Sequence, residues 1–486
     1  MSELHDIDPK RLAERLAEKL HHPPDLVNRT FALTDDAQVH CLFIRTLIDM
    51  GKVEDYVFQF LDEGQVDVND KGRDAEKMVS RLLRRIPLVP SEVASDYDTC
   101  IRGLLNGQCV LLLPHTNEVL LLDASMTVNR AIEEPKTETT VHGPREGLTE
   151  DISINLSLLR KRIKDPNLRI ELLEVGRQTK TVINIIYLQN MAPKEVVDCF
   201  RSRIESAEAN SILDSTNLEE WIQDKTLSPF PTLLETERPD VATSHILEGR
   251  VVVLVDNSPF ALVGPITLFQ FFSAPEDYYQ RADVATLLRW LRMLSFLLAV
   301  FVPAVYVAVI SYHQELLPNP LLINIAAQRE GVPFPTFIEA AIMLVTFEIL
   351  REAGLRMPRI AGQAISIVGA LVLGEAAVQA GLVSAAMVIV VSITAIANFV
   401  SPAYSFGISQ RILQFTYMAL GGFMGLFGIL CGVLFTIVHL ASIKSFGVSY
   451  LAPVAPTVLS DWKDILARAP LPFLKKPPIM NRKKIK

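Results

Sequence analysis

The chain has 486 residues, of which 49% are hydrophobic, and its mean hydropathy is +0.27. A positive mean is unusual for a soluble protein of this length and predicts apolar surface beyond a single core. The formal net charge of −8 argues against a nucleic-acid partner bound through a general basic face. The five cysteines form no CxxC pair and show no zinc-ligand spacing, so we expect no metal or cofactor.

The first 24 residues are charged and lack the apolar stretch of a signal peptide. They are typical of a polar helix that ends at Pro23 and Pro24, and we expect this segment (1–24) to be exposed or mobile. Because no export signal is evident, the part of the chain that follows is expected to stay in the cytosol.

Residues 25–283 alternate between apolar, β-rich runs and charged segments with helical periodicity, such as 73–86 and 194–206. This alternation predicts α/β layers. The apolar runs are 39–48, 109–113, 119–122, 182–188, 251–255 and 260–263.

An internal repeat is visible in this region. Two predicted hairpins turn at 114–117 and 256–259, where turn-forming residues separate apolar runs. Similar tripeptides precede them, Leu105-Asn106-Gly107 and Leu247-Glu248-Gly249. We therefore expect two similar α/β subdomains in tandem, at 25–135 and 165–283.

A connector, 136–164, separates the two copies and contains the stretch HGPREGLTE at 142–150. Thr149 is a plausible N-cap for a helix that runs to about Lys164. A structured connector is favoured over a ligand site here.

The chain becomes strongly apolar near residue 284, and we expect a transmembrane domain at 284–445 followed by a basic tail at 446–486. Four spans of adequate length and a shorter fifth one are predicted. The short span carries Glu339 and Glu348. The five segments are 291–312, 335–350, 360–380, 382–400 and 412–441.

The positive-inside rule places Arg289 and Arg292, and with them the N-terminal domain, in the cytosol. The basic tail should also be cytosolic, although five crossings would leave it outside. One segment must therefore enter and leave on the same side. The candidates are 316–335 and the run 412–441, which glycines interrupt.

No nucleotide-binding, hydrolase or metalloprotease motif is present, so we expect no enzyme. Polar groups inside membrane spans usually face a protein interior or a water path. Small residues along 360–380 suit either tight packing or a pore lining. The pore-lining candidates are Gln363, Ser366, Gly369 and Glu375, and the gating or vestibule candidates are Glu339, Glu348 and Glu352. An alternative for Glu352 is simple pairing with Arg356, four residues on.

Several long motifs together resemble the A subunits of bacterial spore germinant receptors. A paralogous family, the stage V sporulation AF proteins, shares them. The motifs are VHGPREGLTE (141–150), FIEA (337–340), FEILREAGLRMP (347–358), GQAISIVGALVLGEAAVQAGLVS (362–384), SITAIANFVSPAYSFGISQRILQF (392–415) and DWKD (461–464).

This resemblance implies two tandem thioredoxin-like subdomains followed by an all-α transmembrane bundle of four to six helices. It also implies a multi-pass protein of the spore inner membrane that acts with a permease-like B subunit and a lipoprotein C subunit. The A subunit is expected to form a homo-oligomeric, ligand-gated channel for monovalent cations that triggers germination. The alternatives are a germination-amplifying paralogue, a secondary transporter and a non-conducting scaffold.

Overall fold

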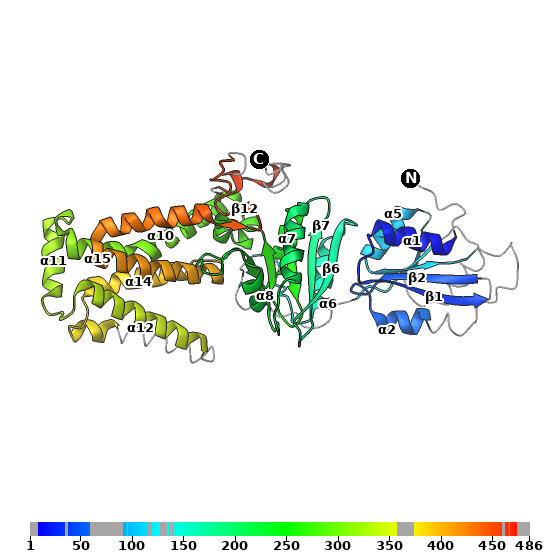
Figure 1. Ribbon diagram of the computed structural model, residues 1–486, viewed down its shortest axis with the longest axis horizontal. Coiled ribbons are helices and arrows are strands. Elements are labelled where there is room, and N and C mark those ends of the chain that lie inside the picture. Colours follow the sequence, from blue (N-terminus) through cyan, green and yellow to red (C-terminus); the bar gives the residue numbers. More distant parts are fainter. Residues whose placement is uncertain are drawn as a thin grey trace.

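The computed structural model describes residues 8–34, 37–58, 91–94, 96–114, 119–126, 134–135, 138, 140, 142–356, 374–458, 462–465 and 467–473. Figure 1 shows three parts in a row along the molecule. The first α/β subdomain lies at one end, the second lies in the middle, and a helical region forms the other end.

The first subdomain contains a five-stranded sheet in the order β1-β2-β4-β5-β3, in which every pair of neighbours is antiparallel. Helices α1 and α5 cover one face of the sheet, and α2 packs against the other. Its elements are α1 (Pro9–Lys19), β1 (Leu26–Thr34), β2 (Ala37–Ile44), α2 (Met50–Val53), η1 (Glu54–Phe58), β3 (Ser91–Ala94), α5 (Tyr97–Leu105), β4 (Gln108–Leu112) and β5 (Val119–Asp123).

Helix α1 corrects the expectation of an exposed N-terminal helix. Asp8 caps it by accepting a hydrogen bond from the Lys10 N–H. Leu12 and Leu16 are buried against the first sheet because they share one face of the helix, which a purely compositional interpretation overlooks.

The second subdomain repeats this architecture, with strand order β6-β7-β9-β10-β8. The matching order confirms the predicted repeat, and β4–β5 and β9–β10 confirm the two predicted hairpins. Its elements are α6 (Ile152–Arg162), β6 (Leu168–Val175), β7 (Thr181–Leu188), α7 (Lys194–Glu205), α8 (Ser215–Ile222), β8 (Leu234–Thr236), α9 (Pro239–Leu247), β9 (Val251–Val255) and β10 (Ala261–Gly264).

The connector helix α6 begins later than expected. Asp151, not Thr149, caps it, because its carboxylate accepts hydrogen bonds from the N–H groups of Ser153 and Ile154. The Thr149 N–H instead donates to the side-chain oxygen of Asn155 at 2.7 Å. The same helix links the two subdomains through a buried ion pair, in which Arg160 lies 2.7 Å from Asp25.

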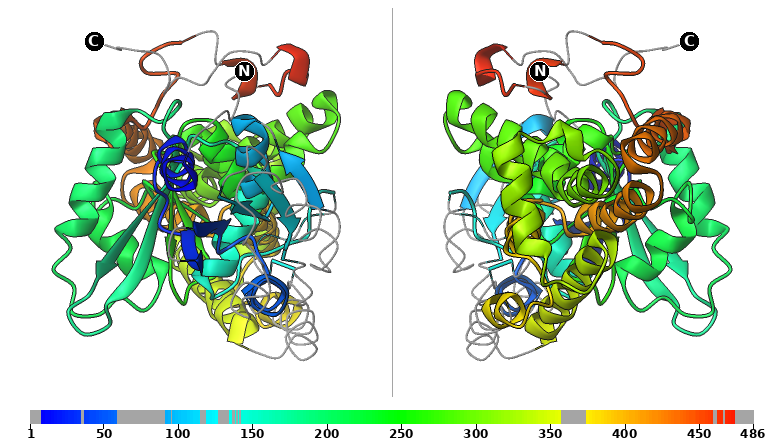
Figure 2. Two further views of the ribbon diagram at one scale, coloured as in Figure 1. Left: turned by 90° about the vertical axis from the view of Figure 1, so that its right-hand side faces the viewer. Right: turned by 90° about the vertical axis from the view of Figure 1, so that its left-hand side faces the viewer.

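The helical region contains α10 (Ala282–Tyr312), α11 (Asn319–Arg329), α12 (Thr336–Arg356), α14 (Ala385–Phe399) and α15 (Tyr404–Ser442). Viewed along the long axis, its helices lie side by side (Figure 2). Among the described residues, α10 and α15 are long and apolar enough to cross a membrane, and α14 is a shorter apolar helix. The expected class, an α/β part followed by a helical part, is confirmed.

Helix α15 is folded into a hairpin at Gly425, whose backbone angles (φ 64°, ψ −150°) are not helical. The hydroxyl groups of Tyr417 and Thr436 are 2.8 Å apart. In a straight helix, residues nineteen apart would be separated by about 28 Å. The sequence left two candidates for the segment that turns back, and the structure shows the turn in 412–441. The other candidate, 316–335, contains the separate short helix α11.

Both ends of this hairpin contact the second subdomain. The Ser409 hydroxyl donates to the Pro229 carbonyl, and Ser228 and His439 are hydrogen-bonded at 2.9 Å. The C-terminal segment consequently begins on the side of the α/β subdomains.

Candidate functional site

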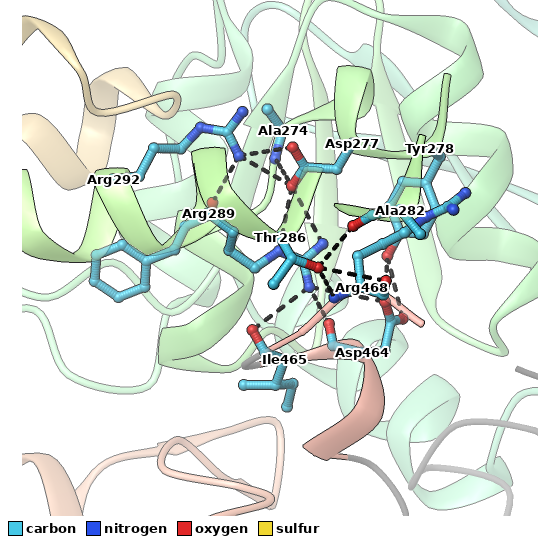
Figure 3. Close-up of polar contacts among 11 residues, drawn as sticks. Ala274, Asp277, Tyr278, Ala282, Thr286, Arg289, Arg292, Asp464, Ile465 and Arg468 are labelled. Atoms are coloured by element: carbon cyan, nitrogen blue, oxygen red, sulfur yellow. Dashed lines mark hydrogen bonds and ion pairs between the residues drawn. The ribbon is translucent and has the colours of Figure 1, made fainter. Parts of the chain in front are cut away.

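A cluster of hydrogen bonds and ion pairs lies where the chain enters α10 (Figure 3). Three segments meet there: η3 (Pro275–Tyr278), the first turns of α10, and the C-terminal residues 462–465 and 467–468. We call this cluster the α10 junction. It is the place where the second α/β subdomain is joined to the first long apolar helix.

Asp277 is the centre of the junction. Its carboxylate is fully buried and accepts hydrogen bonds from Arg289 at 3.2 Å and from Arg292 at 2.8 and 2.9 Å. The Ala274 N–H also donates to it at 3.3 Å, which closes the turn of η3. Arg289 and Arg292 point to one carboxylate because residues three apart lie on the same face of a helix.

Arg289 also holds the C-terminal segment. Its side chain is 0% exposed, and its Nη1 donates to the backbone carbonyls of Asp464 and Ile465. Beside it, the Arg468 N–H donates to the Thr286 hydroxyl at 3.0 Å. One buried guanidinium therefore ties the subdomain, the helix and the tail together.

The electrostatic environment follows from burial. Burial raises the pKa of Asp464 although Arg289 acts in the opposite direction, and the Tyr278 hydroxyl donates to the Asp464 carboxylate at 3.2 Å. Burial alone would also raise the pKa of nearby Glu248, but Arg250 and His245 outweigh it and lower that pKa to about 2. Glu248 is thus a fixed negative charge beside the junction.

The far end of α15 is fastened to the same subdomain. After the helix, β11 (Lys444–Ser445) and β12 (Val448–Ser449) form a small hairpin. Between them Phe446, 3% exposed, stacks on Phe200 with ring centroids 3.6 Å apart and joins the core of the second subdomain. The Ser445 hydroxyl donates to the Thr232 carbonyl at 2.7 Å.

The second subdomain therefore makes buried contacts with both the first helix of the helical region, at the α10 junction, and the segment that follows the last helix, at Phe446. This arrangement can transmit a displacement of the subdomain to two helices at once. Closely packed contacts, such as the buried ion pairs and the aromatic stacking, have low compressibility and therefore transmit strain. Within the part of the chain that the structure describes, no cluster of His, Cys, Asp or Glu could hold a metal ion.

Glu339, a predicted gating residue, is fully buried near the start of α12. Its Oε1 accepts hydrogen bonds from both the N–H and the hydroxyl of Ser384, each at 2.6 Å. Ser384 is the N-cap of α14, so this carboxylate fixes α12 to the start of α14. Arg329 lies 3.8 Å away.

The other acidic candidates on α12 are paired. Glu348 lies 2.5 Å from Arg351 and 3.7 Å from Arg411 of α15, and so it bridges two helices. Glu352 is paired with Arg356 at 2.7 Å, which is the structural alternative considered for it. Glu348 and Glu352 share a helix end, whereas Glu339 lies near the opposite end of α12.

Most of the predicted pore-lining residues are not among the residues that the structure describes. Gln363, Ser366 and Gly369 lie outside the described residues. Glu375 is exposed and accepts a hydrogen bond from Gln379 at 3.2 Å. No contact among the described residues brings Glu375 together with the acidic groups of α12.

Sequence reasoning missed two features. Arg289 and Arg292 were interpreted only as topology markers, and their partner Asp277 was not considered. Asn398 lies in the predicted span 382–400, and its bonds to Gln410 at 2.8 Å and Gln414 at 3.3 Å, which join α14 to α15, were not predicted. For the first of these features the sequence did contain a signal, because the acidic Asp277 precedes Arg289 and Arg292, which lie three residues apart as on one face of a helix.

Comparison with known proteins gives consistent matches over nearly the whole chain. The profile of the family described as Bacillus/Clostridium GerA spore germination protein matches residues 14–480. Spore germination protein KA of Bacillus subtilis (strain 168) is 40% identical over 465 residues, which cover 94% of this chain and 84% of that protein. Spore germination protein GerLA of Bacillus cereus is 37% identical over 466 residues, covering 96% and 94%.

Two further matches concern the membrane and the α/β part. The uncharacterized membrane protein YfkQ of Bacillus subtilis (strain 168) is 38% identical over 480 residues, covering 97% of this chain and 92% of that protein. The crystal structure of the N-terminal domain of the A subunit of the Bacillus megaterium spore germinant receptor GerK3 matches with a TM-score of 0.43 and 29% identity. That match covers 54% of this chain and 96% of the crystallised one.

Proposed function

This chain belongs to the Bacillus/Clostridium GerA family of spore germination proteins, and from that premise we propose that it is the A subunit of a spore germinant receptor. The family consists of germination proteins and not of enzymes, so the assignment confirms that the chain is not an enzyme. It is a membrane protein with two candidate transmembrane helices, α10 and α15.

The finer function that we propose is ion conduction. Several copies of the helical region would surround a pore for monovalent cations in the spore inner membrane, with the α/β subdomains in the cytosol. The partners would be a permease-like B subunit, which binds the nutrient, and a lipoprotein C subunit. Support comes from the family assignment and from polar groups, such as Glu339, that lie buried between apolar helices. The thioredoxin-like character of each subdomain is part of the same proposal.

The fold supports a topology of six crossings. The ends of α10 and of the first arm of α15 (residues 404–424) meet, since the Tyr312 hydroxyl donates to the Gly422 carbonyl at 2.8 Å. Gly381 lies beside Gly331 on that same side. Helices α10, α12 and α14 and the two arms of α15 supply five of these crossings. The sixth is the predicted span at 360–380, which lies mostly outside the described residues. Both the N-terminal domain and the tail end on the cytosolic side, as their basic residues require.

The observation that carries the mechanism is the burial of Arg289 between Asp277 and the tail. A nutrient bound to a partner subunit would favour one position of the second subdomain. The α10 junction and Phe446 would pass that preference to α10 and α15. Opening is thus a population shift between two arrangements of the ring, limited by the differential affinity of the nutrient for them.

The experiment is ion flux from liposomes that contain the purified chain with its B and C partners. We place the pore on 360–380, so Ser366→Trp should block nutrient-dependent cation flux and Glu375→Gln should lower cation selectivity. Phe435→Trp is the control, because Phe435 is 75% exposed and the change keeps an aromatic group there.

Two outcomes would contradict the proposal. Flux that is unchanged in Ser366→Trp would place the pore on another span. No nutrient-dependent flux from a correctly assembled complex would favour a non-conducting scaffold.

A further inference from the structure

An apolar side chain stands in an unusual position on the second subdomain. Leu227 is 98% exposed, the largest exposure of any large hydrophobic side chain among the described residues. It belongs to the segment 223–231, between α8 and β8, which we call the interfacial loop. Lys225 and Thr226 beside it are exposed as well.

The interfacial loop lies at the base of the α15 hairpin. The Lys225 ammonium donates to the Ser442 hydroxyl at 2.9 Å, and Ser228 is bonded to His439. The Pro229 carbonyl accepts a hydrogen bond from Ser409 of the first arm. The loop thus contacts both arms where they leave the membrane on the side of the α/β subdomains.

The exposure of Leu227 is imposed by the fold. Phe230 is buried in the aromatic cluster that also contains Phe271, Phe406 and Tyr450. The Asp224 carboxylate accepts a hydrogen bond from the Phe446 N–H at 2.7 Å. Because the loop is held on both sides of Leu227, the leucine cannot turn inward without breaking these contacts.

The surroundings have the chemistry of a lipid interface. Trp221, at the end of α8, is half exposed, and tryptophan is enriched at the level of lipid headgroups. Lys225 is exposed, and its positive charge is attracted to anionic headgroups. On the second arm of α15, residues 426–442, Phe435 and Val438 expose most of their side chains just before His439.

We propose that the interfacial loop is a membrane anchor, which inserts Leu227 into the boundary between headgroups and acyl chains of the leaflet facing the α/β subdomains. The partner is the lipid itself. Such an anchor would fix the height of the second subdomain above the membrane, next to the helices that it grips. The inference depends on the membrane assignment and does not depend on ion conduction.

The test measures the depth of a fluorescent label. A nitrobenzoxadiazole group is attached at Leu227→Cys in the full-length chain, with Cys199→Ala and Cys431→Ser. The other three cysteines are buried. Leu213→Cys is the matched control. Leu213 is a 68% exposed leucine at the opposite end of α8, where Asp214 is bonded to Ser258 of the membrane-distal turn.

The chain is reconstituted in liposomes of phosphatidylethanolamine and phosphatidylglycerol. Doxyl groups placed near the headgroup should quench the Leu227→Cys label more than doxyl groups at the chain end. Aqueous iodide should quench it several-fold less than the Leu213→Cys label. Both labelled variants should melt at the same temperature as their background, because both positions are exposed.

Equal quenching of the two labels by iodide, with no quenching by lipid, would overturn the proposal. A Leu227→Cys label shielded from both quenchers would also overturn it, because protein would then cover the loop.

Discussion

Asp277→Asn is the substitution that tests the α10 junction most sharply. It removes the one carboxylate that both Arg289 and Arg292 contact and leaves two guanidinium groups facing each other in a buried site. Loss of one partner from a buried ion pair costs about 3–5 kcal/mol. We expect a destabilisation of that order. Arg292→Met should cost less, about 1.5–3 kcal/mol, since Asp277 keeps Arg289 as its partner.

Asp283→Asn is the matched control. Asp283 is six positions further along and is also paired with an arginine, Arg281, but both side chains are exposed, at 63% and 84%. This control should leave the unfolding temperature unchanged, because exposed ion pairs contribute little.

Two measurements report on the junction. Thermal unfolding in lipid nanodiscs gives the stability of the whole chain. Limited digestion with trypsin reports on the tail, because Arg289 holds the carbonyls of Asp464 and Ile465 next to the cleavable residue Lys463. Asp277→Asn should lower the unfolding temperature and accelerate cleavage at Lys463. If it behaves like Asp283→Asn in both assays, the junction does not couple the three segments.

Three further predictions concern other elements. Gly425→Ala should lower the unfolding temperature, at a cost of about 1–3 kcal/mol. Only glycine readily adopts the backbone angles of this position, and a Cβ would lie 2.8 Å from His313. The control is Gly407→Ala on the same helix, which should be neutral or stabilising because a Cβ there would contact no other atom. Glu339→Ala should destabilise the chain more than Glu339→Gln, which keeps an acceptor for Ser384; equal unfolding temperatures would refute the bond. Burial and Glu235 raise the pKa of Glu219 from 4.5 to about 8, so its protonated form adds stability that is full below pH 4.5 and lost as the pH rises through 8. Glu219→Gln should flatten this part of the stability curve, and an unchanged slope would contradict the shift.

The strands that the sequence predicted are those buried on both faces. β9 and β10 are continuous apolar runs, β7 is apolar apart from Thr181 and Asn184, and nearly all of their side chains are buried. The edge strands β1 and β6 were missed because charged side chains interrupt them, Arg29 in β1 and Arg169, Glu171 and Glu174 in β6. An edge strand needs only one apolar face, so its composition resembles that of a loop or a helix.

The contacts of the site that join distant parts of the chain could not be predicted from the sequence. The glycines of α15 made 412–441 one of two candidates for a turn, because glycine is unfavourable in a helix interior, but they did not decide between the two. By contrast, the bond from Arg289 to Asp464 joins residues 175 positions apart, and no local pattern encodes it. The local sequence also could not show that Asp151 and not Thr149 is the N-cap, since both side chains are good caps. In the structure, the N–H and the hydroxyl of Thr149 donate hydrogen bonds to the side chain of Asn155 instead.

The most direct test of the proposed function is the electrical conductance of the assembled receptor in a planar lipid bilayer. We predict cation-selective current that appears on addition of the nutrient and is abolished by Ser366→Trp, but not by Phe435→Trp. A complete complex that binds its nutrient and passes no current would contradict the claim that this subunit forms a channel.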